Sequence, residues 1–443
     1  MNNKLNLQLN LPLDCATDAA QKQPSASARV FTNGAATANY WSSTENNANN
    51  AWYQSFSDGS QSNNNKNNLN RVRCVRSQYQ AVPPIGAIEK LQEDIVPIAD
   101  YPFTLEEVFK AYYSCRKNKR NSDHQIQFEM DLEKNLINLF EEIKSQRYKP
   151  LPSEVFVVTK PKPREVWAAQ FRDRVVHHII YNRISPWYHK RFIQDSYACI
   201  PGRGIHNAVT RAVKATRKET KNYKDIAYFG KFDLANFFAS IHLPTVWKIF
   251  KRDGVLENDV LQFLLHETLF NQRREEAIKK GNALNFSKVP EHKSLFKAHQ
   301  DRGLPIGNLD SQLIANVVMN ELDWYMKHVV GVEHYIRYVD DILIIHQDIR
   351  FIKRCHLLME NFVSKRLLMN FNPKKTIFNQ TSKGIDLLGY FILPGRVYLR
   401  RNTYRRVERN LANSKLNLNK ENFDKSLAAY RGMFSHCQSK FNL

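Results

Sequence analysis

The chain has 443 residues, of which 42% are hydrophobic, and a formal net charge of +22 at pH 7. This length accommodates two or three domains with buried cores, and no apolar run approaches the roughly 20 residues needed to cross a bilayer. The six cysteines lie far apart without a C-x-x-C pair, which argues against a zinc site or a disulfide framework. The first residues also lack a signal-peptide core, so we expect a cytoplasmic protein with no membrane partner.

The positive charge is unevenly distributed. Residues 1–100 carry eight Lys/Arg and eight Asp/Glu, so the whole excess lies in the remaining 343 residues. Positive charge concentrated in this way favours a polyphosphate partner such as a nucleic acid. A basic surface that serves only solubility is the alternative.

The first hundred residues differ from the rest in amino-acid composition. Residues 39–79 combine aromatic side chains with turn signals and predict short strands. Twelve asparagines lie between positions 33 and 70, and asparagine forms neither helix nor strand readily. We therefore expect residues 1–80 to be largely irregular or disordered. Residues 81–102 contain four prolines and are interpreted as a linker.

After residue 102 the pattern becomes that of regular secondary structure. Apolar residues at helical spacing predict amphipathic helices, and β-branched runs bounded by turn residues predict strands. Helices are expected at 105–118, 131–146 and 173–190, two strands with a turn at 154–169, a strand followed by a helical turn at 226–241, and a β-hairpin at 334–346.

Three aspartates stand at the ends of these apolar strands. Asp340 and Asp341 form the tip of the hairpin in "YVDD", and Asp233 ends the strand in "FGKFDLANFF". Adjacent carboxylates repel each other unless a cation neutralises them, and three carboxylates at two strand ends suit a pair of Mg²⁺ ions. The alternative is that the hairpin uses aspartate only for its turn.

The "YVDD" hairpin, with the blocks before and after it, resembles the reverse transcriptases. "KPKPREVWAAQFRDRVVHHIIYNRI", "SYACIPGRGIHNAV", "FGKFDLANFFASI", "GLPIGNLDSQLIANVVMNELD", "NPKKT" and "GIDLLGYFI" follow in the order of that family's motifs. The resemblance implies an α+β right-hand polymerase. Its fingers and its palm, with an antiparallel sheet and helices, would occupy residues 103–395, and a small basic helical thumb residues 396–443.

The same resemblance implies roles for the residues of the palm. Asp233, Asp340 and Asp341 would hold two Mg²⁺ ions together with the carbonyl of Leu234. Lys375 would protonate the leaving pyrophosphate, with the adjacent Lys374 as the competing candidate.

Other residues would bind the nucleotide and the primer. Arg164 and Lys160 match positions that grip the incoming triphosphate, and Lys162 is an equal candidate to Lys160. Phe238 falls where the family places a steric gate against the 2′-hydroxyl, although core packing is an alternative role. The remaining positions are Ile306 and Gly307 at the nucleotide, and Leu388 and Gly389 in the primer grip.

One motif departs from the common pattern. Many reverse transcriptases have "QGxxxSP", whereas this chain has "IGNLDSQ", with Ile306 and Gln312 at the variant places. This variant is similar to the enzymes of diversity-generating retroelements, which are bacterial or phage-encoded and copy a template RNA with errors opposite adenine. The resemblance implies as partners the template RNA, the RNA/DNA duplex, deoxynucleoside triphosphates and a small basic accessory variability protein.

The asparagine-rich segment fits the same interpretation. Asparagine codons begin with two adenines, and "YWSSTENNANNAWYQSF" with the later "NRVRCVR" resembles the end of the lectin-like proteins that these elements diversify. Two alternatives stay open. The first is a reverse transcriptase of group II intron, retron or antiviral defence type without targeted mutagenesis. The second is a catalytically inactive nucleic-acid-binding protein with a lectin-like N-terminal module.

Overall fold

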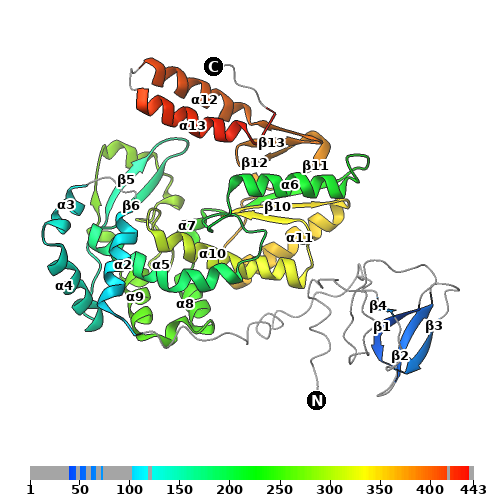
Figure 1. Ribbon diagram of the computed structural model, residues 1–443, viewed down its shortest axis with the longest axis horizontal. Helices are drawn as coiled ribbons and strands as arrows, with labels where there is room; N and C mark the ends of the chain where they lie inside the picture. Colours follow the sequence, from blue (N-terminus) through cyan, green and yellow to red (C-terminus); the bar gives the residue numbers. More distant parts are fainter. Residues whose placement is uncertain are drawn as a thin grey trace. The chain divides into compact units, whose positions relative to one another are not determined.

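The computed structural model describes residues 39–45, 50–55, 61–65, 71–72, 102–117, 122–416 and 420–438 (Figure 1). By their contacts, residues 1–94 and 324–332 form one unit, and residues 95–323 and 333–443 form the other. None of the helices in the described ranges is long and apolar enough to span a membrane.

The first unit contains a four-stranded sheet in the order β3-β2-β1-β4. β2 pairs antiparallel with both β1 and β3, and β4 pairs parallel with β1. The prediction of short strands is confirmed for these stretches, and the expectation that they are irregular is wrong there. The rest of residues 1–80 and nearly all of the linker lie outside the described residues. The strands are β1 (Asn39–Glu45), β2 (Asn50–Ser55), β3 (Gln61–Asn65) and β4 (Arg71–Val72).

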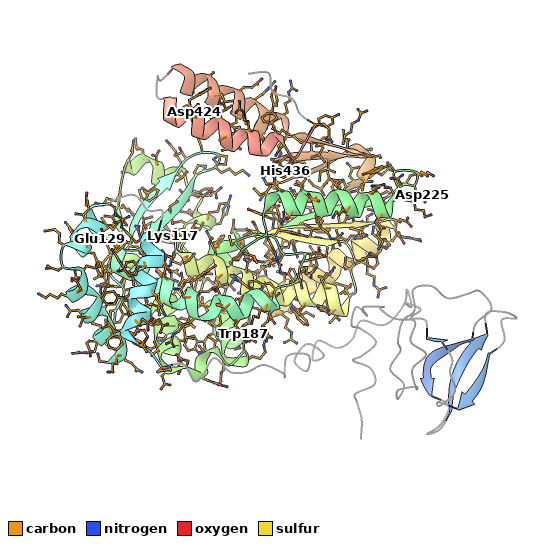
Figure 2. The ribbon with its side chains drawn as sticks, in the orientation of Figure 1. Lys117, Glu129, Trp187, Asp225, Asp424 and His436 are labelled. Carbon is orange, nitrogen blue, oxygen red and sulfur yellow. The ribbon has the colours of Figure 1, made fainter. Side chains whose placement is uncertain are left out.

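The part of the second unit in which fingers are expected begins with a group of helices. Thr104 starts the first of them, because its side chain accepts a hydrogen bond from the backbone N–H of Glu107. Glu129, labelled in Figure 2, accepts hydrogen bonds from Tyr112 and Arg116 and ties two of these helices together. The helices are α2 (Leu105–Arg116), α3 (Asp123–Met130), α4 (Leu132–Lys144) and α5 (Phe171–Arg191), so the predicted helices are present.

A small sheet completes the fingers. β5 (Glu154–Val158) and β6 (Arg164–Ala168) pair antiparallel, as predicted, and β8 (Ile278–Lys279) adds a parallel edge from far along the chain. One face of the sheet is covered by the segment 271–303, in which Phe296 packs its ring 4.7 Å from that of Trp167. Nothing in the local pattern of β8 predicted this third strand.

The palm is a four-stranded sheet in the order β11-β7-β10-β9, with all neighbours antiparallel. Helix α6 contacts β9 and β10, and α11 packs on β7 and β10. Gly230 permits the close approach of α11, because a Cβ there would collide with the side chains of Phe232 and Ile352. The strands are β7 (Tyr228–Asp233), β9 (Tyr335–Tyr338), β10 (Asp341–His346) and β11 (Ile377–Gln380).

Further helices belong to this unit, and among them α6 and α11 pack directly on the strands of the sheet (Figure 1). Their buried faces are predominantly aliphatic, and α10 is buried along most of its length. They are α6 (Ile205–Glu219), α7 (Phe237–Ser240), α8 (Leu243–Arg252), α9 (Asp259–Phe270), α10 (Leu309–Trp324) and α11 (Ile349–Phe362).

A three-stranded meander leads from the palm to two C-terminal helices. β12 (Ile385–Leu387), β13 (Tyr390–Leu393) and β14 (Arg396–Leu399) are followed by α12 (Arg401–Leu416) and α13 (Lys420–Phe434). Residues 396–399, expected at the start of a helical thumb, are a strand of the meander, and the first of the two helices starts at residue 401. After α13, His436 stacks on His206 of α6 with ring centroids 3.8 Å apart, which ties the end of the thumb to the palm (Figure 2).

Candidate active site

The palm sheet brings the three predicted carboxylates to one end. Asp341 begins β10 and pairs directly with Asp233, the last residue of β7. β9 and β10 form a hairpin in which Tyr338 faces Asp341, so Val339 and Asp340 are the two residues of its turn. The three aspartates therefore lie together at the edge of the sheet where these strands end or turn.

The electrostatics of this group favour a bound cation. Burial, followed by the charges of Asp233 and Asp341, raises the pKa of Asp340 to about 6. Burial also raises the pKa of Asp341, against the opposing effect of Lys231. Three oxygen donors that repel one another fit hard divalent cations such as Mg²⁺, which prefer carboxylate ligands.

Leu234 follows the first aspartate and is buried. It forms an isolated antiparallel bridge with Phe371, whose hydrogen bonds are made by the flanking residues: Ala235 donates to Asn370 and Asn372 donates to Asp233. In such a pair the central residues direct their own backbone groups away from each other. The carbonyl of Leu234 is thus not used by this bridge, which is compatible with its predicted role as a metal ligand.

Of the two adjacent lysines, Lys375 is the one that reaches the carboxylates. Its Nζ lies 2.6 Å from both carboxylate oxygens of Asp233. The short helical turn Pro373–Lys375 is held there because Asn372 caps it and donates its backbone N–H to the carbonyl of Asp233 at 2.8 Å. Lys375 as the proton donor for the leaving pyrophosphate stays a prediction.

The two phenylalanines of α7 have different environments. Phe237 is buried in the core, whereas Phe238 is partly exposed and lines a small cavity with Leu304 and Ile306. The backbone N–H of Leu304 donates to the carbonyl of Phe238 at 2.9 Å. Phe238, the predicted steric gate, and Ile306, the variant residue, therefore line the same small cavity.

The turn that contains Ile306 is attached to the fingers. The N–H of Trp167 in β6 donates to the carbonyl of Ile306 at 2.7 Å. Gly307 has φ +133°, and a Cβ there would collide with the carbonyl of Trp167, so only glycine allows this approach. Arg164, the residue predicted to bind the triphosphate, begins the same strand and is exposed. Strand β6 therefore links Arg164 to the turn that contains Ile306.

The turn 159–163 between β5 and β6 carries the other two basic candidates. Lys160 and Lys162 are both exposed. The structure does not distinguish between them, and either one as a triphosphate ligand stays a prediction.

The predicted primer grip is a tight turn between β12 and β13. Leu387 pairs with Tyr390, which leaves Leu388 and Gly389 as a two-residue loop, and both have positive φ angles, of 50° and 90°. This is the pattern of a type I′ hairpin turn. The backbone N–H of Arg400 donates to the carbonyl of Gly389 at 2.9 Å and holds the turn against the start of α12.

Three contributors near the site were not identified from the sequence. Lys231 of β7 approaches Asp341, and Arg337 of β9 donates to the carbonyl of Val339 in the turn of the hairpin. Glu165 of β6 is buried and accepts hydrogen bonds from Ser294 and from the backbone of Leu295, in the segment 271–303. A charged residue inside an apolar strand was the available signal for all three.

The chain matches two protein families, in different regions. The family described as reverse transcriptase (RNA-dependent DNA polymerase) matches residues 158–392. A second family, described as the Lcl C-terminal domain, matches residues 12–76. Protein YkfC of Escherichia coli (strain K12) is 25% identical over 190 residues, which cover 42% of this chain and 44% of YkfC. The match thus spans less than half the length of this curated relative.

Two solved telomerase structures are also similar. The structure from Candida albicans in complex with a fragment of telomeric RNA has a TM-score of 0.36 and 13% identity, covering 62% of this chain and 52% of that chain. The truncated apo structure from Candida tropicalis has a TM-score of 0.38 and 12% identity, covering 60% of each chain. Because the family match covers more than half of the residues, the chain belongs to the reverse transcriptase (RNA-dependent DNA polymerase) family.

Proposed function

We propose that this protein is the RNA-directed DNA polymerase of a diversity-generating retroelement, which makes error-prone cDNA from a template-repeat RNA. The pairing of Asp233 with Asp341 beside the Asp340 turn is the observation that carries the polymerase activity. The targeted mutagenesis is supported by Ile306, which lines the small cavity with Phe238. The N-terminal match to a family other than the polymerase fits the view that this segment is not part of the enzyme.

Each side chain of the site has a role in nucleotidyl transfer. When bound, Mg²⁺ ions activate the primer 3′-hydroxyl and neutralise the triphosphate and the leaving pyrophosphate. Asp233, Asp340, Asp341 and the carbonyl of Leu234 would hold them. Lys375 would donate a proton from Nζ to the leaving pyrophosphate.

The nucleotide itself is held by other groups. Arg164 offers paired donors to the phosphate oxygens, and Lys160 or Lys162 adds a point charge. Phe238 fills the space that a 2′-hydroxyl requires and so favours deoxynucleotides. The turn at Leu388 and Gly389 supports the primer strand.

The proposed mutagenesis follows from the chemistry of residue 306. A polar side chain that hydrogen-bonds the nucleotide discriminates strongly, whereas an apolar contact contributes about 1–3 kcal/mol of discrimination. Ile306 offers only apolar contact to a nucleotide beside Phe238, so mispairs are rejected weakly. The accessory protein and the template RNA are proposed partners, and the excess positive charge supports the RNA.

The activity is tested by primer extension on an RNA template with Mg²⁺ and all four deoxynucleotides. The wild type should synthesise cDNA, and Asp340→Ala should lower the rate about a thousandfold, equivalent to roughly 4 kcal/mol of transition-state stabilisation. Equal synthesis by both proteins would remove the enzyme assignment and favour an inactive nucleic-acid-binding protein.

The mutagenic class is tested by sequencing the products of the same reaction. Ile306→Gln should reduce misincorporation opposite template adenine by on the order of tenfold, the effect of about 1.4 kcal/mol. Ile306→Leu is the matched control, since it keeps the apolar contact, and its errors should resemble those of the wild type. An unchanged error spectrum in Ile306→Gln would favour a retron, group II intron or defence-type enzyme.

A further inference from the structure

We propose that Lys231 binds the phosphodiester next to the 3′ end of the primer strand, an inference that rests on the proposed polymerase function. Lys231 lies on β7, two residues before Asp233. It would hold the last phosphate of the primer while Asp233 and Asp341 act on the neighbouring 3′-hydroxyl.

The direction of Lys231 follows from the alternation of β7. Phe232 points toward α11, where its ring stacks on that of His356 at 4.8 Å. Successive side chains of a strand point to opposite faces, so Lys231 and Asp233 share the face opposite α11. β7 is an inner strand of the sheet, flanked by β10 and β11. A lysine there needs a polar partner, because its ammonium group is costly to bury.

The contacts of Lys231 leave part of its hydrogen-bonding capacity unused. Its side chain is 17% exposed, and its Nζ lies 3.2 Å from the carbonyl oxygen of Asp386 and 3.8 Å from Oδ1 of Asp341. The first distance is a hydrogen bond, whereas the second is a longer ionic contact. An ammonium group has three donors, so Lys231 can donate to a further oxygen.

The position of Lys231 joins the catalytic group to the primer grip. Asp386 lies in β12, two residues before Leu388, and its carboxylate pairs with Arg400. Arg400 in turn holds the carbonyl of Gly389. If the Leu388–Gly389 turn holds the primer and the aspartates hold its 3′-hydroxyl, the last phosphate of the primer lies between that turn and the aspartates.

The other cation at the carboxylates is already engaged. Lys375 has both oxygens of Asp233 within 2.6 Å. Among the described residues, the carboxylate oxygen nearest to Lys231 is Oδ1 of Asp341, at 3.8 Å. The competing explanation is that Lys231 serves only to neutralise Asp341. The two explanations differ in a measurable way, because a phosphate contact adds to the salt dependence of nucleic-acid binding and an internal ion pair does not.

The experiment measures binding of a fluorescent DNA primer annealed to an RNA template by anisotropy, in EDTA and over a range of salt concentrations. Lys231→Met should weaken binding and reduce the slope of log K against log salt by about 0.9, the value for one phosphate contact. The binding constant of the wild type divided by that of Lys231→Met should then fall about threefold for each fourfold rise in salt concentration. Lys231→Arg keeps the charge and should restore the slope.

The matched control is Lys353→Met, since Lys353 is an exposed lysine on α11, which packs on the other face of the sheet. Its binding and salt slope should equal those of the wild type. Lys231→Gln is a second test variant if Lys231→Met proves unstable in thermal unfolding, and it should show the same reduced slope.

An unchanged affinity and slope in a folded Lys231→Met protein would overturn the inference. A lower Mg²⁺ requirement in primer extension, without any change in binding, would show that Lys231 acts on Asp341 alone and would overturn it too. Failure of the proposed function has a different signature, because the wild-type protein itself would then fail to extend the primer with Mg²⁺, whether or not it binds the template–primer.

Discussion

Arg337 and Asp323 form an ion pair, 2.8 Å long, in which both side chains are completely buried. Arg337 lies on β9, three residues before Asp340, and also donates from Nη1 to the carbonyl of Val339 at 2.9 Å. Val339 has φ +57°, an uncommon and strained conformation for a β-branched residue. The ion pair with α10 therefore supports the strained turn that presents the proposed catalytic carboxylates.

Substitution of Arg337 separates stability from catalysis. Arg337→Met should lower the free energy of unfolding by about 3–5 kcal/mol, because it leaves Asp323 buried without its cation. Arg337→Met combined with Asp323→Leu should recover most of that loss in urea unfolding, since no buried charge is then unpaired. The double variant should still polymerise slowly, because the carbonyl of Val339 lacks its donor. Full primer-extension activity in the double variant would show that Arg337 only stabilises the fold.

Gly307, in the turn that contains Ile306, provides a second test. Gly307→Ala should destabilise the protein by about 1–3 kcal/mol and raise the KM for deoxynucleotides, because its Cβ would collide with the carbonyl of Trp167 and strain the backbone. Gly204→Ala is the control, since a Cβ at Gly204 meets no atom within 4 Å. Thermal unfolding and steady-state kinetics measure both effects. Wild-type KM and stability in Gly307→Ala would contradict the close approach of the two backbones.

The buried pair of His177 and Asp310 predicts a pH dependence of stability. The ring Nδ1 of His177 lies 2.8 Å from Oδ2 of Asp310. Burial alone would lower the pKa of His177. The negative charge of Asp310, with a smaller contribution from Asp173, outweighs the effect of burial, so the pKa is raised above 6.5. A raised histidine pKa stabilises the folded state fully below the unfolded-state pKa, and this stabilisation is lost as pH rises through the folded-state pKa.

As pH rises above about 6.5, the ordinary pKa of histidine, the thermal midpoint of the wild type should therefore fall more steeply than that of His177→Gln. The glutamine keeps a polar side chain at the site but cannot become charged. Parallel midpoint curves for the two proteins would show that the ion pair contributes no pH-dependent stability.

Removal of the N-terminal segment tests the interpretation of the asparagine cluster. Residues 95–323 and 333–443 form one compact unit, and every proposed site residue lies within it. Deletion of residues 1–80 should therefore leave primer extension within about twofold of the full chain, as expected for a separable domain. The same deletion carrying Asp340→Ala is the negative control. Loss of activity on deletion would contradict the hypothesis that this segment is a template repeat read in frame, with no role in the fold of the enzyme.

The sequence supported the local parts of the site well and the non-local parts poorly. Asp340 and Asp341 were recognisable because an acidic pair inside an apolar hairpin is visible within a dozen residues. The contact of Lys375 with Asp233 required the structure, because it depends on how the capped turn at Asn372 is attached to the end of β7. The burial of Glu165 could not be predicted, since its partners Ser294 and Leu295 lie about 130 residues away.

The sequence by itself determined the family, the order of the motifs and the strand-end carboxylates, because these follow from short-range patterns of apolar and charged residues. It also marked "NNNKNNLNRVRCVR" as foreign in composition to the polymerase that follows. Only the tertiary structure decided which charges meet. It placed Lys231 between Asp341 and Asp386, and it placed the guanidinium of Arg337 at the carbonyl of Val339. Such pairings depend on strand register and helix packing, which no single segment of the chain specifies.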